Sequence, residues 1–166
     1  MSKDGLISGW SIQVPENLLG GWSISEDLIK SVQEFIPRAG RILEFGSGNG
    51  TFELINLGYQ LFSVEENSKF IGLHHSTYCL AEIENGWYNK ERVLNFLENR
   101  DFDALLIDGP AKGDRLKMLE IGIDFEKFKT IIIDDIDREG DRDLFDTLSK
   151  GKKHKLTSTY GVIFND

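Results

Sequence analysis

The sequence predicts an α/β domain in which helices alternate with the strands of a mostly parallel sheet. Short apolar runs at 41–45, 102–107 and 129–133 stop at acidic residues or glycines. Such runs are typical of buried parallel strands, because helices cover both faces of a parallel sheet. Segments with apolar residues at helical spacing lie between the runs. The length of 166 residues indicates one domain, which we take as residues 1–166.

The elements are expected in the following order. Residues 1–24 are too apolar for a disordered tail, so we expect an ordered lead-in, in which Trp10 and Trp22 are packing residues. A capping box of Ser23 and Glu26 predicts a helix that ends at Pro37. Further along we expect a strand at 41–45, a helix at 51–57, a strand at 59–64, a short helix at 68–75 and a strand at 78–83.

The second half continues the alternation. Asn89 is a candidate N-cap for a helix. We then expect a strand at 102–107, a helix at 116–121, a strand at 129–133, a helix at 138–150 and two final strands at 155–160 and 162–164.

Composition excludes several classes of function. The net charge is −9, from 28 acidic and 19 basic residues, and the basic residues cluster only at 150–155. Nucleic acid is therefore not an expected partner, because phosphate backbones require clustered Lys and Arg. The single cysteine, Cys79, excludes an internal disulfide and, with no signal-like start, predicts a cytoplasmic location. No run approaches the roughly 18 apolar residues that a membrane helix needs, so no membrane partner is expected.

The central motif is Glu44-x-Gly46-x-Gly48-x-Gly50, directly after a predicted strand. Its glycines allow positive φ and let a ligand approach the backbone closely. A strand, a glycine turn and a helix start together form a nucleotide site at the carboxyl edge of a sheet. In a dinucleotide fingerprint the third glycine comes one residue later. An acid at Glu44 also repels phosphate and suits an ammonium group.

Two further acids end predicted strands. Glu65 lies 21 residues after Glu44 (65 − 44), where an acid holds the ribose in Rossmann-type nucleotide sites. Its carboxylate can accept from both vicinal hydroxyls. Asp108 ends the next apolar run and precedes Gly109-Pro110, which places it beside the ligand crevice.

These motifs resemble those of the class I S-adenosylmethionine (SAM)-dependent methyltransferases. Glu44–Gly50 resembles motif I, Ser63–Asn67 motif II, and Ile107–Pro110 motif IV in a form seen in small-molecule O-methyltransferase relatives. The resemblance covers about residues 23–164. It implies a Rossmann-like three-layer α/β/α sandwich, with a mostly parallel seven-stranded sheet that has one antiparallel strand near the C-terminus.

The resemblance also implies SAM as cofactor. The residues that would hold it are Glu44, Gly46, Ser47, Gly48, Gly50, Glu65, Glu66, Ile83 and Asp108. In this scheme the glycines pass close to the methionine part, and Glu44 steers the loop and the ammonium group. Glu65 holds the ribose, and Ile83 lies against the adenine.

The expected reaction is methyl transfer to an oxygen or nitrogen of a small molecule. Asp108, or Lys112 with a lowered pKa, is the candidate proton acceptor. The catechol-type O-methyltransferases hold Mg²⁺ with acids at this edge of the sheet, so Asp108, Asp134 and Asp135 are candidate Mg²⁺ ligands. An acidic rim without metal is the alternative.

Two other functions stay open. One is a module that binds SAM without catalysis, and the other is a Rossmann-like domain for another nucleotide. The oligomeric state is not predicted.

Overall fold

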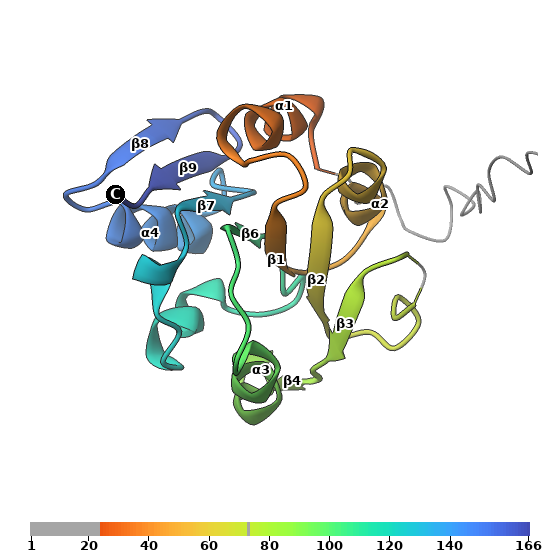
Figure 1. The fold of residues 1–166 in the computed structure, drawn as a ribbon. Coiled ribbons are helices and arrows are strands. Elements are labelled where there is room, and N and C mark those ends of the chain that lie inside the picture. Colours follow the sequence, from red (N-terminus) through yellow and green to blue (C-terminus); the bar gives the residue numbers. More distant parts are fainter. Residues whose placement is uncertain (1–23, 73) are drawn as a thin grey trace, which may run out of the picture.

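The computed structural model describes residues 24–72 and 74–166. The expectations for the lead-in, including Trp10, Trp22 and Ser23, therefore fall on residues outside the described part. Seven strands form one sheet in the order β3-β2-β1-β6-β7-β9-β8 (Figure 1). They are β1 (Arg41–Phe45), β2 (Gln60–Glu65), β3 (Thr77–Leu80), β6 (Ala104–Ile107), β7 (Thr130–Ile133), β8 (Lys153–Leu156) and β9 (Gly161–Phe164).

The strand directions confirm the predicted sheet. β1 runs parallel to both β2 and β6, β2 is parallel to β3, and β6 is parallel to β7. β9 is antiparallel to both of its neighbours, β7 and β8. The sheet is thus mostly parallel with one reversed strand near the C-terminus, as a Rossmann-like methyltransferase fold requires.

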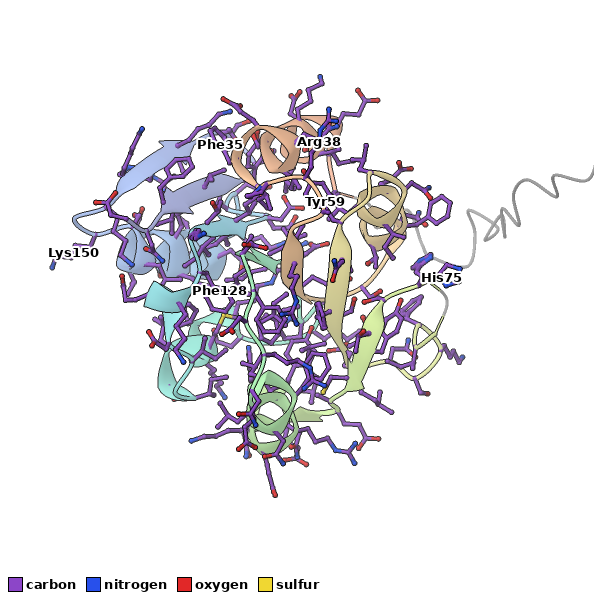
Figure 2. The ribbon with its side chains drawn as sticks, in the orientation of Figure 1. Phe35, Arg38, Tyr59, His75, Phe128 and Lys150 are labelled. Carbon is purple, nitrogen blue, oxygen red and sulfur yellow. The ribbon has the colours of Figure 1, made fainter. Side chains whose placement is uncertain are left out.

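Helices cover both faces of the sheet, which gives the three layers. The helices are α1 (Glu26–Phe35), α2 (Asn49–Asn56), α3 (Lys90–Leu97) and α4 (Glu139–Leu148), with 3₁₀ helices η2 (Arg115–Glu120) and η3 (Phe125–Lys127). Alternate strand residues face opposite layers. Leu43, Phe45 and Ile107 pack with α3 and α4, whereas Ile42 and Leu106 pack with α1 and α2. Side chains fill the space between the sheet and the helices (Figure 2).

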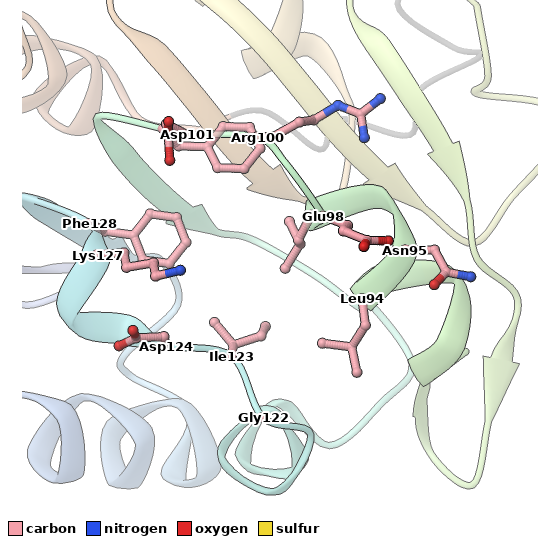
Figure 3. A pocket seen from close by; sticks show the side chains of 12 residues that line it. Leu94, Asn95, Glu98, Arg100, Asp101, Gly122, Ile123, Asp124, Lys127 and Phe128 are labelled. Atoms are coloured by element: carbon pink, nitrogen blue, oxygen red, sulfur yellow. The ribbon is translucent and has the colours of Figure 1, made fainter.

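The two edges of the sheet differ. At the carboxyl edge the loop between β1 and α2 contacts the residues that follow β6. At the amino edge, near the starts of β6 and β7, a cavity of about 620 Å³ lies beside α3 (Figure 3). None of the helices in the described residues is long and apolar enough to span a membrane.

The helix predicted at 68–75 is not formed. In the described part of that range the chain makes turns after β2. Asn67 starts them, because its side-chain oxygen accepts from the N–H of Lys69 at 3.0 Å and its main-chain oxygen accepts from Phe70 at 2.9 Å. Such local bonding competes with a helix.

The strand predicted at 78–83 is shorter than expected. β3 ends at Leu80, and Ile83 belongs instead to a separate hairpin of β4 (Ile83–Glu84) and β5 (Trp87–Tyr88). Asn85 and Gly86 form its turn, with φ of 53° and 84°. Paired positive φ values are typical of a tight hairpin turn.

Three smaller expectations also change. The N-cap of α1 is Ser25, which accepts from the N–H of Leu28 at 3.2 Å. The predicted helix at 116–121 is the 3₁₀ helix η2. The strand expected at 155–160 ends at Leu156, because the hydroxyl of Thr157 accepts from the N–H of Tyr160 at 3.0 Å and closes a turn.

Candidate functional site

The glycine loop crosses the chain that follows β6 at van der Waals contact. Gly46 has a φ of +88°, and a Cβ there would lie 3.0 Å from the carbonyl of Asp108. A Cβ on Gly109 would lie 2.8 Å from the Cα of Gly46 and 2.4 Å from the hydroxyl of Tyr88. Both crossing positions therefore require glycine, and the loops after β1 and β6 meet at the carboxyl edge, as predicted.

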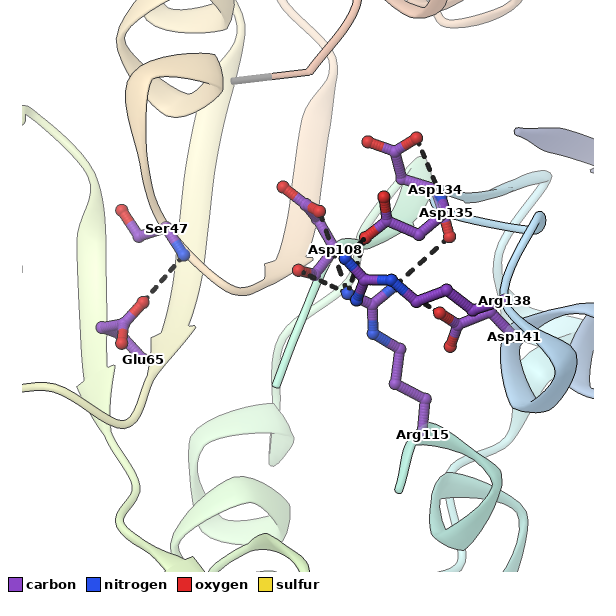
Figure 4. Close-up of polar contacts among 8 residues, drawn as sticks. All are labelled: Ser47, Glu65, Asp108, Arg115, Asp134, Asp135, Arg138 and Asp141. Carbon is purple, nitrogen blue, oxygen red and sulfur yellow. Dashed lines mark hydrogen bonds and ion pairs between the residues drawn. The ribbon is translucent and has the colours of Figure 1, made fainter. Parts of the chain in front are cut away.

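Glu65 is tied to the glycine loop. Its carboxylate accepts from the N–H of Ser47 at 2.9 Å (Figure 4). It also accepts from the N–H of Asn67 at 2.8 Å. A carboxylate has about four acceptor sites, so these two bonds leave capacity for the hydroxyls of a ligand. The structure thus brings together Ser47 and Glu65, two of the residues expected at the cofactor.

Glu66 has an unused acceptor beside Glu65. Its Oε2 is buried and has no hydrogen-bond partner within residues 24–72 and 74–166. Burial raises the pKa of Glu66, the charge of Glu65 raises it further, and the charge of Lys112 lowers it. Because its charge acts on Glu66, the exposed side chain of Lys112 lies on the Glu66 side of the site. A buried acceptor without a partner is costly and marks a place for a donor.

Glu44 differs from its expected role. The side chain is only 2% exposed, and its Oε1 accepts from the hydroxyls of Thr51 at 2.6 Å and Ser63 at 2.5 Å. Burial raises its pKa to about 8, although both hydrogen bonds oppose the rise. At neutral pH this carboxyl is therefore mostly protonated and offers little charge to an ammonium group. Its observed role is to hold α2 against β2.

The remaining residues of the glycine loop either form hydrogen bonds or allow close packing. The hydroxyl of Ser47 lies 3.1 Å from those of Thr51 and Tyr78, and the N–H of Gly48 donates to Thr51 at 3.0 Å. A Cβ on Gly50 would lie 2.7 Å from Ile24, so this glycine permits packing of α2.

Ile83, expected beside the adenine, lies in β4. It is partly buried and packs against the core cluster that contains Val93 of α3.

Arg115, which sequence reasoning missed, organises the acids that follow β6 and β7. It is buried, and one of its terminal nitrogens donates to the carbonyl of Asp108 at 2.9 Å and to the carboxylate of Asp135 at 3.2 Å. The other donates to the carbonyl of Asp134 at 3.2 Å and pairs with Asp141 at 3.2 Å (Figure 4). Asp141 lies 26 positions further along the chain (141 − 115), so no local signal could reveal this pairing.

The three aspartates are not arranged as the expected Mg²⁺ site. The described residues contain no group of three or more His, Cys, Asp or Glu that could hold a metal ion. The positive charge beside these acids comes from arginines instead, since Arg115 lies 4.0 Å from the Asp108 carboxylate and Arg138 lies 3.1 Å from Asp135.

Asp108 keeps the properties of a proton acceptor. Its side chain is 34% exposed. Burial and the charge of Asp134 raise its pKa to about 7, while Arg115 opposes the rise. A carboxylate with a pKa near the working pH suits general base catalysis.

Comparisons with known proteins agree on the fold. No family model matches the chain. The MycE methyltransferase of the mycinamycin pathway, solved with Mg and SAH, has a TM-score of 0.55 at 11% identity, over 84% of this chain and 45% of that one. A TehB-like SAM-dependent methyltransferase of Corynebacterium glutamicum has a TM-score of 0.52 at 12% identity, over 91% and 94%.

The C-terminal domain of precorrin-6Y C5,15-methyltransferase from Rhodobacter capsulatus has a TM-score of 0.54 at 11% identity, over 90% of this chain and 94% of that domain. At such identities the likeness shows the fold alone. The chain therefore has the fold of the class I SAM-dependent methyltransferases.

One curated relative differs in its description. A probable nicotinate-nucleotide adenylyltransferase of Bacillus cytotoxicus is 27% identical over 124 residues, which are 74% of this chain. The chain spans 56% of the length of that relative.

Proposed function

We propose that this chain transfers the methyl group of SAM to an oxygen or nitrogen of a small molecule. The observation that carries the proposal is the 2.9 Å bond between Glu65 and the glycine loop at Ser47, on a sheet with methyltransferase strand order. This contact holds the end of β2 and the loop after β1 together, at the sheet edge where nucleotides bind in α/β folds.

The residues at this edge fit SAM. Gly46 and Gly109 let the loops after β1 and β6 cross in direct contact, which places both loops at this edge. The spare acceptor sites of Glu65 suit the two ribose hydroxyls. The buried Oε2 of Glu66, which has no partner within the described residues, suits a ligand N–H or O–H donor. When bound, SAM supplies an activated methyl group on its sulfonium.

The protein contributes positioning and a proton acceptor. We assign the acceptor substrate to a cavity of about 240 Å³ between the loop after β6 and the start of α4, lined in part by Pro110, Arg115 and Arg138. Asp108 is not in this lining, but its carboxylate lies 4.0 Å from Arg115, which is. Its carboxylate takes the proton from the reacting oxygen or nitrogen, and Lys112 is the second candidate for this role. Holding the two reactants in line supplies most of the acceleration.

Calorimetric titration with SAM and with S-adenosylhomocysteine tests the proposal. We expect micromolar binding by the wild type, a loss of at least about tenfold in Glu65→Ala, and no change in Glu53→Ala, which alters an exposed acid on α2. Because Glu65 also holds the loop, circular dichroism must show that the variant is folded. Glu66→Gln is a second, milder variant.

Other results of these titrations would contradict the proposal or favour another function. A folded wild type that binds neither ligand contradicts the proposal. Binding of NAD or ATP instead would favour a domain for another nucleotide, for which the similarity to the adenylyltransferase is the supporting observation. Tight SAM binding without any methyl acceptor in a broad screen would favour a non-catalytic module.

A further inference from the structure

The cavity at the amino edge of the sheet is separate from the proposed methyl-transfer site. Phe102 and Phe128, which line it, precede β6 and β7, whereas the glycine loop and Asp108 follow the carboxyl ends of their strands. Its volume of about 620 Å³ lies within the range of small-molecule sites, roughly 300–1,000 Å³. This cavity has no role in the reaction proposed above.

Five apolar side chains form part of its wall, and most of them remain partly exposed to solvent. Leu94 and Leu97 of α3, with Phe102 and Ile123, are half-buried, and Phe128 is buried (Figure 3). The rings of Phe102 and Phe128 stack, with centroids 6.3 Å apart at 21°, and Phe102 also packs against Phe62 at 5.2 Å. A ligand that covers this surface gains about 25 cal/mol per Å² of apolar area removed from water.

Five charged side chains line the cavity: the bases Arg100 and Lys127, and the acids Glu98, Asp101 and Asp124. Lys127 is exposed and extends toward the cavity, whereas the carboxylates of Glu98 and Asp124 point away from its centre (Figure 3). Among the ion pairs of residues 24–72 and 74–166, none involves Lys127. Arg100, the other basic residue of the rim, donates to the carbonyl of Phe96 and lies 4.7 Å over its ring, so its charge is already engaged.

We propose that this cavity binds a small apolar carboxylic acid, whose hydrocarbon body lies against the apolar walls and whose carboxylate pairs with Lys127. The walls supply most of the affinity, because apolar burial scales with area. An exposed ion pair adds up to about fivefold in affinity, which selects an anion over a cation. The site is independent of SAM, since its lining shares no residue with the glycine loop.

The test uses three naphthalene probes that differ only in charge: 2-naphthoate, 2-naphthylmethylamine and 2-naphthalenemethanol. Titration of the ¹⁵N-labelled protein, followed by NMR, should move the amide signals of residues 94–98 and 122–128. We expect 2-naphthoate to bind most tightly. Lys127→Met should weaken its binding by up to about fivefold and leave the neutral probe unchanged. Lys129→Met, a matched change at an exposed lysine two positions away, should have no effect.

A second pair of variants tests the apolar wall. Leu94→Glu places a negative charge in the wall and should reduce binding of 2-naphthoate and of the neutral probe, whereas Leu119→Glu, at a leucine that is 37% exposed, should not. Melting temperatures confirm that the variants are folded, and SAM titration of Lys127→Met should match that of the wild type. The proposal is overturned if the amine binds as tightly as 2-naphthoate, if Lys127→Met behaves like Lys129→Met, or if no probe binds at millimolar concentration.

Discussion

Arg115 donates a 2.9 Å hydrogen bond to the carbonyl of Asp108, at the point where β6 ends. The same guanidinium donates to the carbonyl of Asp134, just after β7, and pairs with Asp141 in the first turn of α4. A single side chain, only 3% exposed, thus fixes two strand ends and one helix start. It also supplies the charge that keeps these acids close together.

Loss of Arg115 should therefore destabilise the fold. Removing one partner of a buried ion pair leaves an uncompensated charge, so Arg115→Met should lower the free energy of unfolding by about 3–5 kcal/mol. Arg142→Met removes an exposed pair with Asp146 and should cost less than about 1 kcal/mol. Urea unfolding of both variants measures the difference. Equal stabilities would show that the Arg115 contacts contribute little.

The proposed base has a distinct pH signature. A base acts when deprotonated, so the rate of methyl transfer to an identified acceptor should rise as pH increases through about 7, where Asp108 ionises. Asp108→Asn should lower the rate at saturating SAM by about 10²–10⁴ and abolish this rise. Asp137→Asn, at an exposed acid nearby, is the control. A wild-type profile in Asp108→Asn would remove Asp108 from the mechanism and leave Lys112 to be tested.

Glu44 should make stability depend on pH. Its pKa is about 8 in the folded protein and 4.5 ordinarily, so between these values the folded state binds more protons than the unfolded chain. Its contribution to stability is fully present below pH 4.5 and is lost as pH rises toward 8. Urea unfolding across this range should show a negative slope that is smaller in Glu44→Gln. Asp108, whose pKa is also raised, accounts for a residual slope.

The control for this prediction is Glu53→Gln, at an exposed acid on α2, which should keep the wild-type slope. If Glu44→Gln and the wild type have the same slope, the carboxyl of Glu44 is ionised in the folded protein.

Substitution by alanine should have opposite effects at a glycine of the loop crossing and at a glycine outside it. Gly109→Ala introduces a Cβ 2.4 Å from the hydroxyl of Tyr88 and 2.8 Å from Gly46, and should cost about 1–3 kcal/mol. Gly140→Ala, in α4, places its Cβ where nothing lies within 4 Å and should stabilise by about 0.4–1 kcal/mol. Thermal unfolding compares the two, and a lower melting temperature for Gly140→Ala than for Gly109→Ala would contradict this packing.

The buried strands and the acids at their ends were predictable because their signals are local. β6 and β7 are buried at every residue and therefore appear as unbroken apolar runs. Glu65 and Asp108 could be chosen as candidate site residues because each stands at the end of a predicted strand. The Asn85-Gly86 turn was also a local signal for the β4–β5 hairpin, and missing it misplaced Ile83.

Other features depend on the tertiary fold. Burial raises the pKa of Glu44 to about 8, and the positions of Thr51 and Ser63 in the sequence give no sign that they enclose its carboxyl. The acids expected to hold a metal are arranged around Arg115, whose other partner, Asp141, comes from the next helix. Burial and long-range pairing thus decided the chemistry of residues that the motifs had located.

The position of β9 has a consequence for synthesis on the ribosome. β9 pairs with β7 on one side and β8 on the other, although it follows both in the chain. Until Gly161–Phe164 emerges, one edge of the apolar strand β7 has no partner, and such an edge can pair with a neighbouring nascent chain. A stop codon before Gly161 should therefore yield an aggregating fragment rather than a smaller working domain.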